Sequence, residues 1–368
     1  MIDIKDKSRC CGCGACAQRC PRACITMQED SHGFLYPRVD AAACVDCHLC
    51  EQVCPCLNDL DAREPLACHA AIHPDEQVRL VSSSGGVFTA LADVVIGAGG
   101  AVFGARFDEH WQVVHDVAQS RDELAPLRGS KYVQSVTGDS FVQVEEFLRQ
   151  GREVMFTGTP CQIAGLKLFL RQDYPQLITV EVACHGVPSP GVWRSYLQGR
   201  SSVSQVNFRD KSTGWRDYSV VIGTARKRHD DDDYMACYLS NHTLRESCFF
   251  CPAKQGRSGA DILIADLWGV KDVPGLKNDD KGTSAIVVYS TRGQEFMQRC
   301  GITLTDVDVR QVVRHNASIT TSSTRPDDYD VFWKKYAASP RWTLKRYGTL
   351  TLSKCVLRLK KKIRRLLR

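Results

Sequence analysis

The sequence predicts a small cysteine-rich α+β domain, then a larger α/β domain with a mostly parallel sheet, and finally a basic amphipathic helix. Three observations predict this order. Two cysteine runs of equal spacing lie within residues 1–60, strand-like and helix-like stretches alternate over residues 66–345, and residues 346–368 are rich in lysine and arginine. A chain of 368 residues is long enough for two or three such domains.

The composition indicates metal binding. The chain has 19 cysteines, and its first residues, MIDIKDKSRC, lack the apolar segment of a secretory signal. No apolar run is long enough to span a membrane. We therefore expect a cytoplasmic protein whose thiols bind metal rather than form disulfides. The net charge is +6, but residues 354–368 hold eight Lys or Arg and no acid, which leaves −2 elsewhere, so we expect no nucleic-acid partner.

The strongest motif is the repeated spacing C-x2-C-x2-C-x3-C-P in CCGCGACAQRCP and CVDCHLCEQVCP. In such runs three thiolates of one tight loop bind a 4Fe–4S cluster, and the fourth cysteine binds the other cluster. Zinc ribbons instead use two C-x2-C pairs. We therefore assign cluster I to Cys10, Cys13, Cys16 and Cys54, and cluster II to Cys20, Cys44, Cys47 and Cys50. Cys11, Cys24 and Cys56 fall outside the pattern and are expected to pack beside the clusters.

Residues 32–40, HGFLYPRVD, alternate apolar and polar side chains and predict a short hairpin between the two runs. Residues 1–60 thus resemble a bacterial-type two-cluster ferredoxin domain, with two short helices on a small sheet. A polar segment that ends in proline, residues 58–65, reads as a linker.

Beyond the linker, the pattern predicts strands at residues 66–72, 101–107, 111–118, 152–156, 177–183, 260–269 and 284–290. Helices are expected within residues 82–100, over 141–150 and 160–172, and from about residue 190. This alternation is typical of an α/β domain. Open sheets of this class bind ligands at the carboxyl ends of their strands.

Several unusual stretches follow predicted strands. SSSGG, residues 82–86, opens a helix with free amides and small side chains, which suits a phosphate or simply caps the helix. Lys131 in RGSKYVQS would neutralise a phosphate or lie exposed. Neither G-x-G-x-x-G nor G-x-x-x-x-G-K-[ST] occurs, so a Rossmann site and a P-loop are both disfavoured.

Four further cysteines have suggestive settings: Cys161 at a helix start, Cys184 in ACHGVPSP, and the pair Cys248 and Cys251 in SCFFCPAK. Cys161 alone would suit a nucleophile, because a helix N-terminus lowers a thiol pKa. Together the four make the set that one cube takes, and we predict that they hold a third 4Fe–4S cluster.

The motifs SSSGGVFTAL, LRGSKYVQS, FTGTPCQIAGL, CHGVPSP, FRDKSTGW, SCFFCPAK and DILIADLWG, in this order, resemble the coenzyme F420 hydrogenase/dehydrogenase beta subunit family. The resemblance covers roughly residues 1–300. It implies an iron–sulfur flavoprotein oxidoreductase with FAD in the large domain. It also implies flavin contacts for Ser83, Ser84, Gly85, Gly86, Lys131, Tyr132, Gly158, Thr159, Asp266 and Trp268, and either proton donation or a structural hydrogen bond for His185.

The family logic is that clusters carry one electron at a time, whereas a flavin collects two and delivers a hydride. We therefore expect electron transfer between a ferredoxin-type partner and an unidentified small-molecule acceptor, in either direction. The alternative is a non-catalytic electron-transfer subunit of a larger complex.

Residues 349–368 place Leu352, Val356, Leu359, Ile363 and Leu366 on one stripe of a cationic helix. Such a helix binds an anionic membrane surface peripherally, docks on the protein body or meets an acidic partner.

Overall fold

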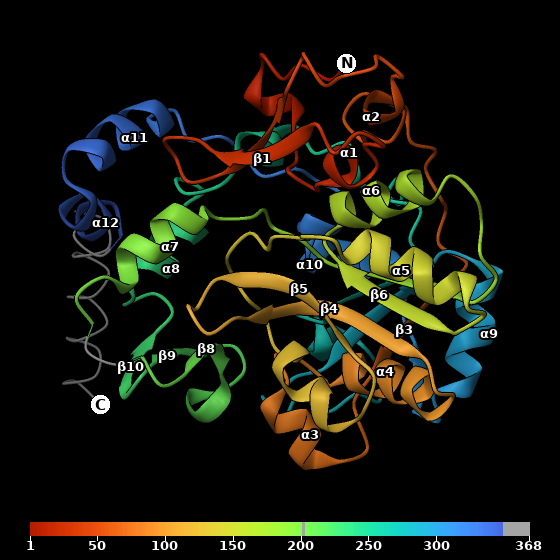
Figure 1. The fold of residues 1–368 in the computed structure, drawn as a ribbon. Helices are drawn as coiled ribbons and strands as arrows, with labels where there is room; N and C mark the ends of the chain where they lie inside the picture. Colours follow the sequence, from red (N-terminus) through yellow and green to blue (C-terminus); the bar gives the residue numbers. More distant parts are fainter. Residues whose placement is uncertain (201–202, 349–368) are drawn as a thin grey trace.

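The computed structural model describes residues 1–200 and 203–348. The cysteine-rich domain lies on one side of a large sheet, with two helices between them, and a second group of helices flanks both (Figure 1). The predicted tail helix over residues 349–368 lies outside the described residues, and the predicted boundary at residues 345/346 falls inside the last described helix. Within the described part of the chain, no helix is both long and apolar enough to cross a bilayer.

The ferredoxin domain has the predicted arrangement of two short helices and a hairpin. It contains η1 (Lys7–Arg9), α1 (Ala15–Gln18), β1 (Ile25–Glu29), β2 (Leu35–Val39) and α2 (Leu49–Gln52), and β1 pairs with β2 antiparallel. The two cysteine runs have equal spacing, and their backbones are alike at the residue before each helix. Gly14 and His48 each precede a helix in the left-handed region, at φ 76° and 57°.

The large domain is built on an eight-stranded sheet in the order β13-β3-β12-β11-β7-β6-β4-β5. The four adjacent strands β4, β6, β7 and β11 are mutually parallel, as predicted. The outer strands β5, β12, β3 and β13 pair antiparallel, so the sheet is mixed. The strands are β3 (Ala67–Ala71), β4 (Ala101–Phe107), β5 (Val113–Ala118), β6 (Val154–Gly158), β7 (Leu177–Val182), β11 (Ile262–Asp266), β12 (Ser284–Val288) and β13 (Leu304–Asp306).

Helices cover both faces of this sheet (Figure 1). α4 (Val87–Gly97) packs on one face, and α5 (Ser140–Arg149) and α6 (Pro160–Leu170) pack on the other, where α1 of the ferredoxin domain rests on them. Strand β6 is buried along its whole length because it is covered from both sides. Shorter elements are α3 (Glu76–Val81), η2 (Asp122–Leu127), η5 (Val270–Asp272), α9 (Thr291–Arg299), α10 (Val309–His315) and η6 (Ala317–Ile319).

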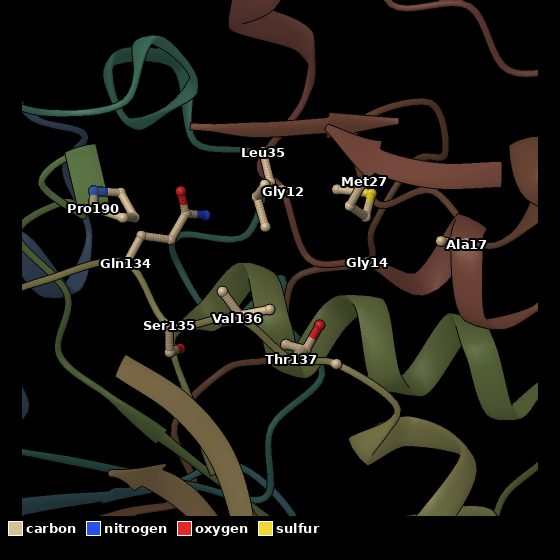
Figure 2. Close-up of a pocket in the computed structure, with 11 residues that line it drawn as sticks. Gly12, Gly14, Ala17, Met27, Leu35, Gln134, Ser135, Val136, Thr137 and Pro190 are labelled. Atoms are coloured by element: carbon tan, nitrogen blue, oxygen red, sulfur yellow. The ribbon is translucent and has the colours of Figure 1, made fainter. Parts of the chain in front are cut away.

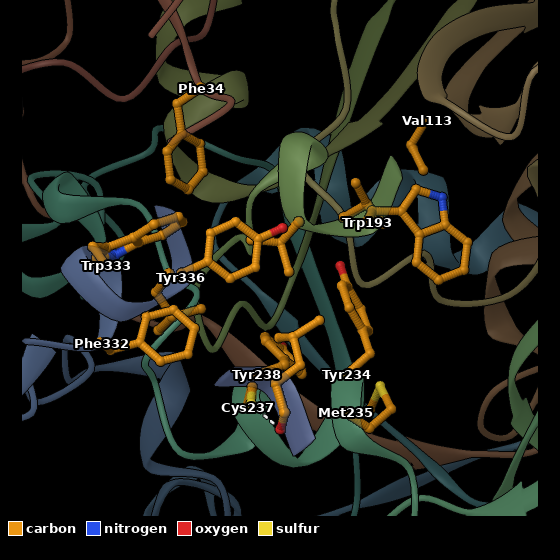
Figure 3. Packing of buried hydrophobic residues seen from close by; sticks show 14 of the residues in the cluster. Phe34, Val113, Trp193, Tyr234, Met235, Cys237, Tyr238, Phe332, Trp333 and Tyr336 are labelled. Atoms are coloured by element: carbon orange, nitrogen blue, oxygen red, sulfur yellow. Dashed lines mark hydrogen bonds between the residues drawn. The ribbon is translucent and has the colours of Figure 1, made fainter. Parts of the chain in front are cut away.

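Residues between β7 and β11, together with the last two described helices, form a second layer, of which the sequence predicted only the helix that begins at Pro190. It comprises a three-stranded antiparallel sheet and a helical group: β8 (Val206–Asp210), β9 (Ser219–Ile222), β10 (Ala225–Arg228), α7 (Pro190–Leu197), α8 (Asp233–Leu239), α11 (Tyr329–Ala338) and α12 (Pro340–Gly348), with η3 (Lys211–Thr213) and η4 (Glu246–Phe250) in the connections. Aromatic side chains from these elements pack into one core (Figure 3).

The ferredoxin hairpin completes that aromatic core. Phe34 is 1% exposed and contacts Trp333 edge to face, and His32 stacks on the same indole at 4.0 Å. Gly33 lies so close to Gly191 that a side chain there would collide with the Gly191 backbone. The two domains therefore pack against each other through a shared core and are not joined by the linker alone.

Candidate functional site

The four thiols predicted for cluster II line one small cavity in the ferredoxin domain. Its walls include Cys20, Cys44, Cys47 and Cys50, together with Cys24. Cys47 is exposed, so this cavity lies at the protein surface. Backbone amides of Ile2 and Asp46 donate to the sulfurs of Cys50 and Cys44 at 3.3 and 3.4 Å. Hydrogen bonds of this kind tune the potential of a bound cluster.

The four thiols predicted for cluster I, Cys10, Cys13, Cys16 and Cys54, are buried, and Cys13 acts electrostatically on the other three. Burial, and then the neighbouring Cys13, raises the pKa of Cys16. A hydrogen bond with Cys56, followed by burial and Cys13, raises the pKa of Cys54. Metal ligation needs thiolates, so binding of a cluster by these four side chains would release protons.

Cys11 connects this group to the large domain. Hydrogen bonds with Cys13 first, and then with Cys161 and Cys56, raise the pKa of Cys11 well above its usual value. The contact with Cys11 lowers the pKa of Cys161 to about 7. Helix α6 approaches residues 10–16, the predicted cluster I loop, so closely that a side chain at Gly165 would meet the Cys13 sulfur at 2.8 Å. Cys11, expected only to pack beside the clusters, thus bridges two thiol groups.

The structure also brings together the four thiols of the predicted third cluster. Cys161 is the second residue of α6, Cys184 follows β7, Cys248 lies in η4 and Cys251 directly follows η4. The four act on one another electrostatically across three chain segments. Burial raises the pKa of Cys184 to about 11 and that of Cys248 to about 12. Their role as ligands stays a prediction, although the required convergence is present.

Polar groups surround the third thiol group. The amide of Val187 donates to the Cys248 sulfur at 3.3 Å, and the Thr159 hydroxyl lies 3.3 Å from the Cys161 sulfur. The Lys254 ammonium donates to the carbonyls of Cys184 and Ser318. Glu181 is 2% exposed with one carboxylate oxygen unpartnered, and burial raises its pKa to about 7.

Three predicted site stretches follow the carboxyl ends of adjacent parallel strands. Thr159 follows β6, Cys184 follows β7, and Asp266 ends β11. This is the edge at which open α/β sheets bind ligands. The register of β6 with β7 and of β7 with β11 sets the three side by side.

Arg209 organises the part of this edge beyond β11. Its guanidinium forms an ion pair with Asp266 at 3.1 Å and donates to the Tyr132 hydroxyl at 3.2 Å and the Ser83 carbonyl at 3.2 Å. The Trp268 ring lies 5.2 Å from it. Arg209 is 5% exposed, and its Nε has no hydrogen-bond partner. A bound group with a hydrogen-bond acceptor would satisfy this orphaned donor.

Other predicted flavin residues are engaged within the protein. The Ser83 hydroxyl accepts from the Ser130 amide at 2.7 Å, and the Ser84 hydroxyl donates to Thr283 at 2.9 Å. Gly85 packs against β3, where a side chain would meet the Ala71 carbonyl at 2.6 Å, and Gly86 caps α4. Lys131 donates to the carbonyls of Pro126 and Arg128, and burial lowers its pKa to about 7. The serine loop therefore has a structural role in tying α4 to the sheet.

His185 joins the third thiol group to the Arg209 site through aromatic contacts. Its ring meets Tyr238 edge to face at 5.5 Å, and Tyr238 stacks on Tyr132 at 5.0 Å. His185 Nε2 lies 2.7 Å from the Asn241 amide oxygen, and burial lowers its pKa. The imidazole thus makes the structural hydrogen bond considered from the sequence, and proton donation stays a prediction.

A cavity of about 190 Å³ lies between the ferredoxin domain and the large domain (Figure 2). Gly12, Gly14, Met27 and Leu35 line one wall, and residues 134–138 line the other. Thr137 and Gln134 cross this boundary to the carbonyls of Cys13 and Cys11, each at 2.8 Å. These bonds hold the cluster I loop against the large domain.

Sequence reasoning missed Arg209 and a second buried arginine, Arg245, whose donors reach the cluster I loop. Arg209 lies in FRDKSTGW and Arg245 just before SCFFCPAK, so each is next to a motif already singled out. A lone arginine has no periodicity or spacing, and only its burial marks it as unusual.

The fold and the thiol groups define an iron–sulfur protein with a dicluster ferredoxin domain joined to an α/β domain. Comparison with known families agrees. Residues 9–58 match the 4Fe-4S dicluster domain, and residues 151–308 match the family described as the C terminus of the coenzyme F420 hydrogenase/dehydrogenase beta subunit. Residues 151–308 are therefore similar to the C-terminal part of this family, and a 4Fe-4S dicluster domain precedes them.

Two curated proteins are similar to parts of the chain. The coenzyme F420-dependent sulfite reductase of Methanocaldococcus jannaschii is 27% identical over 306 residues, which cover 80% of this chain and 46% of that protein. The chain therefore spans about half the length of this relative. An uncharacterized protein from the rpl9-rpl11 intergenic region of Porphyra purpurea is 38% identical over 60 residues, 16% of this chain and 80% of that protein.

One chain of the F420-reducing NiFe hydrogenase complex from Methanosarcina barkeri, a structure solved for xenon derivatization, superposes with a TM-score of 0.49 at 18% identity. The match covers 72% of this chain and 97% of that chain.

The donor sets fit the groups that the family implies. Each of the three thiol groups supplies four cysteines, the number that a 4Fe–4S cluster takes. Among the described residues, no three Cys, His, Asp or Glu side chains are arranged to hold a single metal ion.

Proposed function

We propose that the chain is an iron–sulfur flavoprotein oxidoreductase that exchanges single electrons with a ferredoxin-type protein and a hydride with a small molecule. One observation carries the proposal. The third thiol group contacts the ferredoxin domain through Cys11 and Cys161, and it contacts the Arg209 site through His185 and Tyr238. When bound, the clusters supply one-electron transfer, and FAD supplies the conversion between single electrons and a hydride.

The protein residues have separate tasks in this proposal. Cys10, Cys13, Cys16 and Cys54 hold one cluster, Cys20, Cys44, Cys47 and Cys50 a second, and Cys161, Cys184, Cys248 and Cys251 a third. Arg209 and Asp266 bind the polar edge of the flavin, beside the Trp268 ring. Buried aromatic residues around Tyr132 exclude water from this edge.

The exposed side of the cluster II cavity is the proposed contact for the one-electron partner. Cys47 is the exposed thiol among the eight predicted ferredoxin ligands, whereas the cluster I thiols are buried. Electron transfer between proteins needs close approach of the partner, so this surface is the accessible entry.

The second candidate function is a non-catalytic electron-transfer subunit of a larger complex. It is favoured by the length comparison, because about half of the similar sulfite reductase has no counterpart in this chain. The similar sulfite reductase is named for coenzyme F420, which makes this coenzyme one candidate for the two-electron partner.

Anaerobic purification with iron and flavin quantified per chain tests the proposal. We expect about twelve irons, by the stoichiometry of three 4Fe–4S clusters, and one FAD. Absence of flavin would overturn the flavoprotein assignment. An assay of the purified chain with reduced ferredoxin and a small-molecule acceptor separates the two candidate functions. An oxidoreductase would reduce the acceptor alone, whereas an electron-transfer subunit would be active only with its partner.

A further inference from the structure

Arg245 is a buried cation at the centre of the domain interface. Its exposure is 0%, and it precedes η4, the turn that carries Cys248. The Cys248 amide donates to the Arg245 carbonyl at 2.9 Å, so the backbone of Arg245 belongs to the loop of the third thiol group. Its side chain, however, extends into the ferredoxin domain.

The guanidinium directs its donors at the cluster I loop and its surroundings. Nε donates to the Cys10 carbonyl at 2.6 Å, and one terminal nitrogen lies 3.5 Å from the Cys10 sulfur and donates to the Leu35 carbonyl at 2.9 Å. The other terminal nitrogen donates to the Gln134 amide oxygen at 3.1 Å. Among the described residues, no carboxylate forms an ion pair with Arg245. A buried charge without a counter-charge is strongly disfavoured.

Neighbouring residues fix the guanidinium against the loop. The ring centres of Tyr36 and Phe34 lie 4.1 and 5.3 Å from the central carbon of the guanidinium, and these contacts restrict its orientation. Gly12, in the left-handed region at φ 70°, leaves space for the guanidinium, because a side chain at this position would meet an Arg245 nitrogen at 2.8 Å. The position of the cation beside Cys10 is therefore built into both domains.

We propose that Arg245 supplies the counter-charge of the cluster bound by Cys10 and raises the reduction potential of that cluster. Reduction adds one electron to the cluster, and a cation close to a ligand sulfur stabilises the more negative state. The effect is strong here because the site is buried, where solvent screens charge weakly. Arg245 is a positioning residue, and the inference rests on the proposed assignment of Cys10 to cluster I.

The test is a redox titration of the holoprotein under anaerobic conditions, followed by electron paramagnetic resonance, with dithionite as reductant and mediators. Wild type is compared with R245M, R245K and the control R194M. Arg194 pairs with Glu29 across the same domain interface but donates to no cysteine. We expect one cluster signal of R245M to titrate at a lower potential than in wild type, R245K to lie between them, and R194M to match wild type.

An unchanged potential in an R245M protein that retains its iron overturns the proposal, as does an equal shift in R194M. If R245M loses about four irons per chain while R245K keeps them, the need for a counter-charge is upheld. Equal loss of iron from R245M and R245K overturns it, since the shape of the side chain rather than its charge would then matter. A wild-type protein without two ferredoxin-type clusters would refute the ligand assignment itself, which is a separate result.

Discussion

Replacing Cys161 by alanine is the sharpest test of the third thiol group. Cys161 is the member of the group that contacts the ferredoxin domain, through Cys11. Its pKa of about 7 is the lowest of the four thiols, so it loses its proton most easily. Cys161→Ala leaves Cys184, Cys248 and Cys251 as a set of three. The substitution removes one sulfur at the start of α6 and leaves the Thr159–Gln162 capping interaction in place.

The expected magnitude follows from the ligand count. Three clusters correspond to about twelve irons per chain, so loss of one cluster lowers the content by about four, or one third. Iron and acid-labile sulfide are measured on anaerobically purified protein. Cys300→Ser serves as the control, because the Cys300 thiol donates to the Phe296 carbonyl in another part of the fold.

An unchanged iron content with slower turnover would refute the reasoning and assign Cys161 as a nucleophile. A wild-type content near eight irons would also refute it, because only the ferredoxin pair would then be loaded. A fall of four irons in the Cys300→Ser control would show that the loss is not specific to the third group.

Three further predictions address other parts of the molecule. Burial lowers the pKa of His115 from 6.5 to about 4, so the unfolded chain binds a proton at a higher pH than the folded chain does. The free energy of unfolding should therefore fall by about 3 kcal/mol as the pH drops from about 6.5 to 4. Urea unfolding should show this pH dependence in wild type and less of it in H115Q, and an equal pH dependence in both would contradict the prediction. Asp266→Asn leaves the buried Arg209 without its carboxylate and should weaken FAD binding about tenfold, or about 1.4 kcal/mol, with the iron content unchanged. The control D116N breaks a partly exposed ion pair with Arg106 and should bind FAD as tightly as wild type does. Deleting residues 349–368 should abolish sedimentation with anionic vesicles; equal pelleting of both forms would exclude membrane contact through this tail.

The sequence by itself determined the local features of this protein. The spacing of Cys10, Cys13 and Cys16 predicted a cluster loop because three of the four ligands lie within one tight turn of the chain. Alternating strands and helices predicted an α/β domain, and the parallel strands β4, β6, β7 and β11 confirm it. The start of α6 followed from Thr159 and Pro160, since capping depends on residues within one turn.

Only the tertiary structure decided which distant residues meet. The antiparallel outer strands and the aromatic layer from α7 to α12 depend on contacts between remote segments, which no local pattern encodes. Cys161 and Cys184 meet because β6 and β7 are neighbours in the sheet, and Cys248 reaches them from η4, a remote part of the chain. The buried cations Arg209 and Arg245 are single residues, and their importance appears only when the fold removes them from water and places them beside particular partners.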